Sequence, residues 1–600
     1  MINNVEQHNK IETNEDIIKR NNETNQNAEF VLRDWLGDTK QNYMELSLRP
    51  RYKYFPYISK KTNENNEERT DEKINLFTQY YIDNNKERGQ EIINCLILNL
   101  HNKSVDKIYL LNEKIYSDDE LGIKSDTWKD KLVQVNINKR LTYKDVFDYV
   151  DNEKINGYIV LHNSDIFFDS HINNLKKSNC HDEKKIYCQL RIEYEEKKHL
   201  KDCKLFGPRQ DSQDSWMFHS NFNINKKHRD LFDLKLGIPG CDNNIAYLFT
   251  ILGYMCYNEP LFIKTYHYHL IQKRNYDMNT TKANKPWVGI VPNINNVKID
   301  NNHTFHLKEE NDNLHNYVKN KLENKEIFIL PRIAGIENNY AMIGALIQQS
   351  GQLNPNFAEF IKKTSGVMKN NAGIKFTNIN DVVAYSKLYL DAFHKCDAYF
   401  DWEPWGDVVA AINESYNFVS VNFEKPRFWS FSLDIFHNIY NKPWTHALKG
   451  KRLLIISPFI NSFKSQLSVM NKIYDGVILF PECSFVFLKP PQTQGTNPSK
   501  VFHEELDDFN KKIEEIKDDF DVALVSCGGY GNLVCEQIYS KGKSSIYIGG
   551  VLQMYFGIYG ERWVRERPDV MKLFKNEYWK RPLEEEKPHG SQNVEGSAYW

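Results

Sequence analysis

The stretch GYIVLHNSDIFFD (residues 157–169) begins as an apolar run typical of a β-strand and then breaks off at three polar residues. Asn163, Ser164 and Asp165 end the run, and a second apolar segment follows. One interpretation is structural, because Asn, Ser and Asp favour the turn that ends a strand. The other is chemical, because carboxylates at the carboxyl end of a parallel strand lie where metals and nucleotide diphosphates bind. The rest of the sequence must decide between them.

Strand and helix patterns alternate on both sides of this stretch. Such alternation predicts a parallel sheet with crossover helices. Before it we expect strands at 77–81, 105–113 and 131–137 and helices at 86–102 and 142–153; after it we expect a strand at 184–194, a long apolar helix at 242–258 and an apolar segment at 260–270.

The second half of the chain repeats the alternation after an Asn-rich interval. Strand patterns at 326–337 and 475–481 and a strand–turn–helix pattern at 521–540 belong to this series, and Gly351 is placed to cap a helix. The fold class predicted is α/β, with two Rossmann-like domains that have mainly parallel sheets and are joined by an irregular linker. The expected bounds are a disordered tail at 1–28, an N-terminal arm and linker at 29–75, a first domain at 76–280, a linker at 281–325 and a second domain at 326–600.

Composition narrows the class of protein. A chain of 600 residues with 40% hydrophobic and 13% aromatic residues can build two large cores. The net charge of −2 gives no electrostatic case for a nucleic-acid partner. The ten cysteines include no C-x-x-C pair, and we expect neither a secretory signal nor a membrane-spanning segment. A cytoplasmic location is expected, or the host cytoplasm or virion if the Asn-, Lys- and Ile-rich composition reflects an A+T-rich viral genome.

The second half offers a glycine-rich turn as a binding site. In LVSCGGYGNLVCEQI, a buried strand ends at Cys527, and Gly528, Gly529 and Gly531 open a helix. Glycines let a backbone approach a phosphate, and a helix N-terminus offers free N–H groups. The dinucleotide pattern G-x-G-x-x-G is not met, so nicotinamide binding is disfavoured, whereas a nucleotide-sugar diphosphate needs only the cradle. A tight turn that requires small residues is the other explanation.

Two further strand ends have a similar layout. Ser457, Asn461 and Ser462 follow a strand and either line a donor pocket or cap the next helix. LPRIAGIENN places Arg332, Gly335 and Glu337 after another strand, where Arg332 suits a phosphate and Glu337 suits a metal or a general base.

Acidic and aromatic residues come together at YFDWEPWGDV (399–408). Trp402 and Trp405 suit stacking on a sugar ring, and Asp407 is a candidate base beside them. Buried core anchors are the more common role of such tryptophans.

The first half adds acids at other element boundaries. Asp165 is the better metal candidate of its stretch, Asp214 lies in GPRQDSQDSW, and Asp242 begins a helix, where capping is the simpler role. His267 and His269 alternate on a strand and so face one side, where a carboxylate would complete a metal site; core or solvated histidines are the alternative.

In order over about residues 76–275, TQYY, KIYLLNE, GYIVLHNSDIFFD, RQDSQDSW, PGCDNNIAY and IKTYHYH resemble the type-A nucleotide-diphospho-sugar transferases. In that fold an Asp-x-Asp-like motif after a strand holds a divalent metal and the donor diphosphate. The resemblance therefore implies that Asp165 binds the metal and that Gln79, Tyr80 and Asn163 contact the donor. The motif here reads Asn163-Ser164-Asp165, with one acid.

The second half, about 326–600, resembles the type-D glycosyltransferase fold through RIAGIENN, KPWTHALKGKRLLIISPFINSFKSQ, FLKPPQTQ and DVALVSCGGYGNLVCEQIYSKGKSSIYIGG. That family carries an Asp-x-Glu motif thought to bind a metal–nucleotide. Here the turn reads Gly335-Ile336-Glu337, so only Glu337 matches.

Together these features predict a glycosyltransferase of hexosyltransferase type that uses Mn²⁺ or Mg²⁺, takes a nucleotide-sugar donor and modifies a glycan or glycoprotein. Both halves are active in the leading hypothesis. In the alternatives, only the C-terminal half is catalytic and the first half binds the acceptor, or the protein is a non-catalytic glycan-binding protein. As general bases we expect Glu337 or Asp407 in the second half and Asp214 or Asp242 in the first. The oligomeric state is left open.

Overall fold

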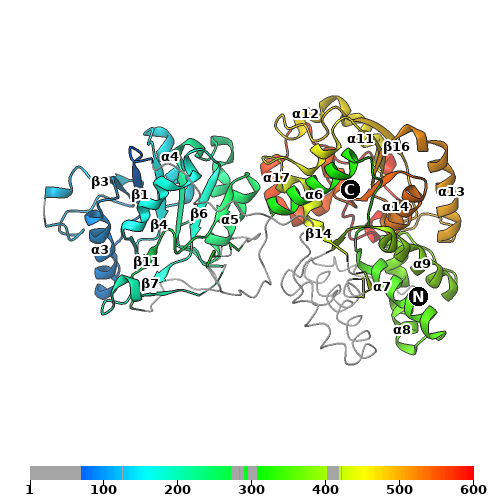
Figure 1. The fold of residues 1–600 in the computed structure, drawn as a ribbon, viewed down its shortest axis with the longest axis horizontal. Coiled ribbons are helices and arrows are strands. Elements are labelled where there is room, and N and C mark those ends of the chain that lie inside the picture. Colours follow the sequence, from blue (N-terminus) through cyan, green and yellow to red (C-terminus); the bar gives the residue numbers. More distant parts are fainter. Residues whose placement is uncertain are drawn as a thin grey trace, which may run out of the picture. The chain divides into compact units, whose positions relative to one another are not determined.

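The computed structural model describes residues 69–600 except 125, 208, 210, 272–282, 284–288, 291, 295–306, 402–417, 420–421 and 424. The chain forms two compact units. Among the described residues, one unit comprises 69–309 with 436–443 and is called the N-terminal unit here; the other comprises 310–435 and 444–600 and is called the C-terminal unit. Each has a central sheet surrounded by helices (Figure 1), which confirms the predicted α/β fold class.

The N-terminal unit is built on a seven-stranded sheet with the order β10-β6-β9-β4-β1-β2-β3. Only β9 runs against its neighbours, so the sheet is mainly parallel. A smaller sheet has the order β5-β11-β7-β8. The strands are β1 (Ile74–Thr78), β2 (Lys107–Asn112), β3 (Leu132–Asn136), β4 (Tyr158–His162), β5 (Ile166–Phe168), β6 (Lys185–Gln189), β7 (Ile192–Glu193), β8 (Lys204–Leu205), β9 (Ser215–His219), β10 (Met255–Tyr257) and β11 (Thr265–His267).

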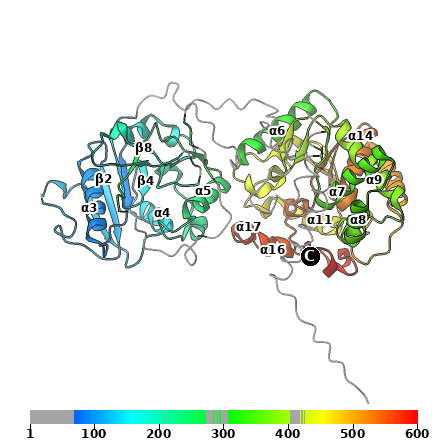
Figure 2. The same cartoon turned by 90° about the horizontal axis from the view of Figure 1, so that it is seen from below.

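Helices cover both faces of the large sheet. Alternate residues of a strand point to opposite faces, so each strand contributes buried side chains to both layers of helices. Leu76 and Val160 pack with α3 (Lys86–His101) in one buried cluster. Phe77 faces the other way and meets Tyr149 of α4 (Tyr143–Asn152), with ring centroids 6.3 Å apart. The helix α4 begins where the sequence predicts it, since Thr142 and Asp145 form a reciprocal capping box. The helix α5 (Cys241–Ile251) also belongs to this unit (Figure 2).

The C-terminal unit has a five-stranded, fully parallel sheet with the order β12-β18-β17-β15-β16. A parallel bridge from Arg332 to Phe400 joins the short pair β13–β14 to its edge. The strands are β12 (Ile329–Leu330), β13 (Tyr399–Asp401), β14 (Arg427–Trp429), β15 (Arg452–Ile456), β16 (Ser484–Leu488), β17 (Val522–Val525) and β18 (Ser544–Tyr547).

One face of this sheet carries a large apolar core. Leu454, Ile456, Ala523 and Val525 pack there against α7, α9, α13 and α14. The helices of this half are α6 (Leu307–Glu323), α7 (Gly335–Ser350), α8 (Pro355–Val367), α9 (Ile379–Lys395), α11 (Ile460–Gln466), α12 (Met470–Ile473), α13 (Phe502–Glu515), α14 (Gly531–Ser540), α15 (Leu552–Tyr555), α16 (Glu561–Glu566) and α17 (Pro568–Phe574).

Residues with a positive φ explain where two expected elements differ from the structure and where one helix ends as predicted. The expected helix at 242–258 stops at Ile251, because Gly253 takes a positive φ of 82° and the chain then enters β10. The expected strand at 475–481 is a turn with Asp475 and Gly476 at positive φ, and β16 follows it. Gly351 caps α7 in the left-handed conformation, as predicted.

Residues 436–443 return to the N-terminal unit from much later in the sequence. The Tyr440 hydroxyl hydrogen-bonds His228 Nε2 at 3.1 Å, and the His437 ring lies 6.1 Å from that of Tyr247. A Cβ at Gly253 would lie 2.9 Å from the Tyr440 carbonyl oxygen, so this contact is close-packed. Sequence patterns gave no sign of this segment.

Candidate active site

A cavity of about 520 Å³ opens at the carboxyl ends of β1, β2 and β4 in the N-terminal unit. Both neighbours of β1 are parallel to it, with β2 on one side and β4 on the other. The order of the strands in the sheet therefore reverses at β1. Ligands of open α/β sheets bind at such a switch point. The lining residues are Gln79, Tyr81, Ile82, Arg88, Glu113, Lys114, Tyr116, Arg140, Asn163, Ser164, Asp165, Arg191, Asp214, Leu236, Gly237, His267 and His269.

Asp165 and the two histidines predicted from their alternation converge in this cavity. Asp165 follows β4, His267 ends β11, and His269 comes two residues later. The Asp165 Oδ2 atom lies 3.2 Å from His267 Nε2 and 3.8 Å from His269 Nδ1. One ligand atom from each of the three residues lies within 4.8 Å of the others, which is the spacing of a metal-binding group. The Nε2 atom of His269 is buried and has no hydrogen-bond partner within the described ranges.

The charges around Asp165 are closely paired. Burial alone would raise the pKa of the Asp165 carboxyl, but His267 and Arg88 hold that pKa well below its usual range. Burial likewise opposes the charged form of His267, yet Asp165 and Glu193 raise its pKa to about 9. Arg88, near the start of α3, bonds Asp165 and also Glu91, at 2.7 Å. A cation at this position would replace a proton on His267 and so bind more tightly as the pH rises.

A second network lies beside the first. Arg191 donates to Asp214 at 2.9 Å, and the Asn163 side-chain amide donates to the other Asp214 oxygen at 3.0 Å. Asp214 is therefore fixed as an ion-paired carboxylate directly before β9.

Asp242 has a different environment at the start of α5. Its oxygens accept backbone N–H groups from Gln213 at 3.2 Å and Asn243 at 3.1 Å. Burial raises the pKa of the Asp242 carboxyl to about 7, and the neighbouring Asp214 charge adds to that rise. The N-cap of α5 is Gly240, which has no side-chain capping bond, so the N-cap role expected for Asp242 is wrong and Asp242 lies in the first turn instead. Its raised pKa suits a general base, and it lies near Asp214 and outside the set of residues that line the cavity.

Gln79 and Tyr80 are placed differently from each other. The Gln79 amide lines the cavity and also ties strand ends together, donating to the carbonyl oxygens of Leu111 and Lys139 at 3.1 and 3.0 Å. Tyr80 is buried and donates to the backbone of Glu120, and burial raises the pKa of its hydroxyl to about 12. The next residue, Tyr81, lines the cavity in its place.

Two basic residues that the sequence patterns did not single out, Lys114 and Arg140, also line the cavity. Lys114 follows β2, and Arg140 follows β3 with an exposed side chain. Arg140 donates to the Leu236 carbonyl oxygen at 2.8 Å and has no carboxylate partner among the residues that the structure describes. A strand end followed by a lone Arg or Lys is a weak pattern, so these two residues had no distinguishing signal.

In the C-terminal unit, a carboxylate occupies the start of α11, where the sequence predicts either a donor pocket or a helix cap. Glu586 accepts the backbone N–H of Asn461 at 2.7 Å and that of Ser462 at 3.2 Å, and the Ser462 hydroxyl as well. The N-cap residue of α11, Phe459, has no side-chain acceptor, which Glu586 supplies from a distant segment. Ser457 is buried, and its hydroxyl accepts the Phe459 N–H at 3.2 Å. These contacts give the donor-binding interpretation of this helix end no support.

The glycine-rich turn at 528–531 is packed against protein atoms. A Cβ at Gly528 would lie 2.9 Å from the Ala372 carbonyl oxygen, and one at Gly531 would lie 2.2 Å from the Tyr547 ring. A Cβ at Gly529 would meet Ile374 at 2.5 Å. Close packing is therefore a sufficient reason for all three glycines, in line with the simpler of the two interpretations.

The other residues predicted for a C-terminal site are Arg332, Gly335, Glu337 and Asp407, and the structure describes the first three of them. The Arg332 guanidinium lies over the Tyr547 ring at 4.9 Å and donates to the Ile548 carbonyl oxygen at 2.9 Å. Glu337 lies in the first turn of α7, which begins at the exposed Gly335; burial, then Glu595, raises the pKa of the Glu337 carboxyl. Asp407, Trp402 and Trp405 lie outside the described residues.

No family model matches this sequence, and no curated protein does either. Two solved structures are similar in part. One is titled "Mannosyltransferase PcManGT from Pyrobaculum calidifontis in complex with GDP-Man and Mn2+"; it is 9% identical, covers 66% of this chain and 92% of its own, and has a TM-score of 0.26. The other is titled as a selenomethionine-substituted domain of unknown function 1792, with 13% identity, 47% and 98% coverage and a TM-score of 0.25. No helix within the described ranges is long and apolar enough to cross a bilayer.

Proposed function

We propose that the N-terminal unit binds a nucleotide-diphospho-sugar together with a divalent cation and transfers the sugar to a hydroxyl group of a glycan. The observation that carries this proposal is the convergence of Asp165, His267 and His269 in a cavity at the switch point of a mainly parallel sheet. A cavity of about 520 Å³ is in the size range of small-molecule sites.

The residues around the cavity suit a charged donor. Asp165, His267 and His269 would hold the cation, and two imidazoles favour Mn²⁺ over Mg²⁺, which prefers oxygen ligands. Such a cation stabilises the negative charge that develops on a diphosphate leaving group. Arg140 and Lys114 also line the cavity, Lys114 in an ion pair with Glu120 at 3.2 Å, and the Arg140 guanidinium can pair with a phosphate in a bidentate manner.

Two carboxylates were candidates for the general base, and their partners favour one of them. Asp214 is held by Arg191 at 2.9 Å and by Asn163 at 3.0 Å, so both of its carboxylate oxygens already have partners within the protein. Asp242 accepts only backbone N–H groups in the hydrogen bonds described above, and its pKa of about 7 matches the task. We assign Asp242 as the base that takes the proton from the acceptor hydroxyl and Asp214 as a positioning residue.

This proposal gives the N-terminal unit the catalytic role. Of the alternatives, catalysis by the C-terminal unit alone draws less support, because its glycine turn and the start of α11 are filled by the chain's own atoms. A glycan-binding protein without turnover is the rival from another class, and bifunctionality stays a prediction.

The test uses the full chain without a histidine tag. Thermal shift and donor hydrolysis are measured with UDP-, GDP- and TDP-sugars, with and without Mn²⁺. We expect one donor to stabilise the protein in a Mn²⁺-dependent manner. That effect should disappear in Asp165→Asn and His269→Gln and persist in Glu337→Gln.

Melting curves without ligand show whether each variant is folded, and His269→Gln breaks no short ion pair, so it isolates ligand binding from stability. A donor effect that is lost in Glu337→Gln but kept in both N-terminal variants would place the site in the other unit. No shift and no turnover with any donor would favour the glycan-binding alternative.

A further inference from the structure

A second cluster of ligating side chains lies at the opposite edge of the N-terminal sheet. Glu72 precedes β1, His181 ends a short 3-10 helix (Asn179–His181), and His219 is the last residue of β9. The strand β9 runs from beside Asp214, which lines the cavity, to His219. A five-residue strand spans about 14–17 Å, so the cluster is separate from the cavity.

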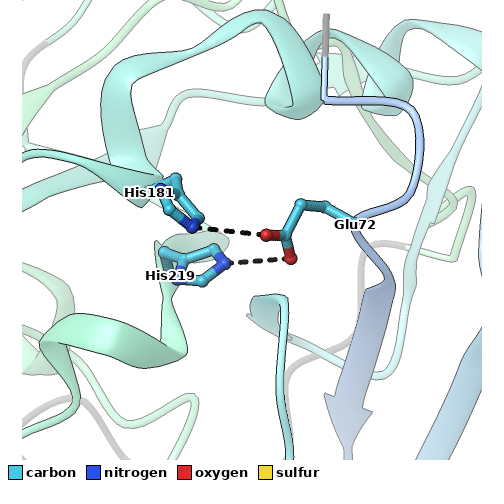
Figure 3. A group of neighbouring side chains, drawn as sticks. All are labelled: Glu72, His181 and His219. Carbon is cyan, nitrogen blue, oxygen red and sulfur yellow. Dashed lines mark hydrogen bonds and ion pairs between the residues drawn. The ribbon is translucent and has the colours of Figure 1, made fainter.

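The three side chains point toward one another (Figure 3). His181 Nε2 lies 3.3 Å from one Glu72 oxygen, and His219 Nε2 lies 3.2 Å from the other. Zinc bonds to nitrogen and oxygen are about 2.0–2.2 Å long, so ligand atoms around a tetrahedral zinc ion lie about 3.3 Å apart. The two histidine–carboxylate separations therefore match those between neighbouring ligands of one ion, and the ligand atoms of all three residues lie within 4.8 Å of one another.

His181 has a carboxylate at each ring nitrogen, an arrangement that favours a cation between His181 and one of the carboxylates. Its Nδ1 atom lies 2.9 Å from Asp182, which is held by Arg69 at 2.8 Å, while Nε2 faces Glu72. A neutral imidazole carries a hydrogen on only one nitrogen, so it cannot donate to both carboxylates. With its hydrogen on Nδ1 toward Asp182, His181 presents a lone pair on Nε2 to the Glu72 oxygen. Metal-binding histidines commonly have this carboxylate contact on the other nitrogen.

His219 is buried and has a hydrogen-bond partner at each ring nitrogen. Its Nδ1 atom accepts the Asn221 backbone N–H at a long 3.2 Å, which leaves a hydrogen on Nε2 toward Glu72 in the neutral ring. A metal at Nε2 would move the hydrogen of the neutral ring to Nδ1, so the bond from Asn221 would be lost when the metal binds. The Glu72 carboxylate offers both oxygens, so the three residues can supply up to four donor atoms.

We propose that Glu72, His181 and His219 form a zinc site that fastens the segment preceding β1 to the end of β9. Two imidazoles and one carboxylate are a ligand set that zinc accepts, whereas Mg²⁺ and Ca²⁺ select all-oxygen sites. The site is structural and lies away from the sugar-transfer chemistry, so it stands whether or not the proposed function holds.

The experiment titrates Zn²⁺ alone into the tag-free full chain after treatment with a chelator. Bound zinc is counted by equilibrium dialysis with elemental analysis, and the melting temperature is followed in parallel. We expect Glu72→Gln and His181→Gln each to lose one equivalent of zinc and the zinc-dependent rise in melting temperature. Asp182→Asn should keep the site with about 10–100-fold weaker binding, because it removes only the carboxylate that orients His181.

Two controls separate this site from other zinc contacts. Asp165→Asn removes a ligand of the cavity group and should leave the equivalent at Glu72 in place. His171→Gln removes another histidine–carboxylate pair, His171 with Asp169 at 2.8 Å, which is absent from the three-ligand groups of the described chain. If Glu72→Gln and His181→Gln, both folded by circular dichroism, bind as much zinc as the unaltered chain, the proposal is wrong and the cation at His181 is a proton.

Discussion

Replacing Glu586 with glutamine tests whether a carboxylate from far along the sequence holds the start of α11. Glu586 is fully buried and accepts three hydrogens, from the Asn461 N–H, the Ser462 N–H and the Ser462 hydroxyl. Glutamine keeps the shape of the side chain but offers one acceptor oxygen and one N–H₂ group. In its better orientation it retains both Ser462 bonds and turns its N–H₂ toward the Asn461 N–H.

The expected loss follows from that geometry. One hydrogen bond to a charged group is worth about 1.5–3 kcal/mol, and a negative charge at a helix N-terminus adds about 0.3–1 kcal/mol. The free energy of unfolding of the C-terminal unit should therefore fall by about 2–4 kcal/mol. For a unit of this size, each kcal/mol lowers the melting temperature by about 2–4 °C.

Differential scanning calorimetry of the full chain measures this shift in the transition of the C-terminal unit. The matched control is Glu584→Gln, because Glu584 is exposed and makes a single ion pair with Lys587 at 3.5 Å, so the change should be within about 0.5 kcal/mol. A double variant with Ser462→Ala should show less than the summed losses, since Ser462→Ala removes a hydroxyl bond that Glu586→Gln has already changed from a charged to a neutral one. Equal melting temperatures for Glu586→Gln and Glu584→Gln would refute the reasoning.

Three further outcomes are expected. Asp242→Asn should abolish transfer and should raise the melting temperature at pH 8 but hardly at pH 4. Because burial raises the pKa of Asp242 to about 7, its contribution to stability is present below about pH 4 and is lost as the pH rises through 7. A difference in melting temperature that does not change with pH would count against this. Arg140→Met should weaken donor binding in a titration by about tenfold and leave melting unchanged, because its side chain is exposed. Gly531→Ala should destabilise by about 1–3 kcal/mol through its clash with Tyr547, whereas Gly366→Ala, in open space on a helix, should stabilise by up to about 1 kcal/mol; equal melting curves would contradict the packing account.

Much of the fold follows from local patterns. The continuous apolar runs that became β2 and β4 are buried on both faces of the sheet, and the period of 3.6 in α3 reflects its one buried face. The α/β class was therefore predictable and is confirmed. The failures at Gly253 and at residues 475–476 came from backbone conformations with positive φ. Apolar composition carries no information about such a break.

The candidate site was predictable where one strand brought the residues together. His267 and His269 alternate on one segment, so a shared side followed from the sequence, and Asp165 stood out at a strand end. Arg88, which pairs with Asp165, belongs to an amphipathic helix where an arginine is unremarkable. Glu586 shows the same limit, because its contact with Ser462 spans 124 positions and only the folded chain reveals it.

The return of residues 436–443 to the N-terminal unit has a consequence for how the protein is made. During synthesis the ribosome releases residues 69–309 long before this segment emerges from the exit tunnel. Until then, the contact of Tyr247 with His437 and the hydrogen bond of His228 with Tyr440 cannot form, because residues 437 and 440 have not been translated. Vectorial folding of this unit therefore ends only after most of the other half has been polymerised, and a recombinant fragment that stops at the linker lacks a piece that would have to be supplied in trans.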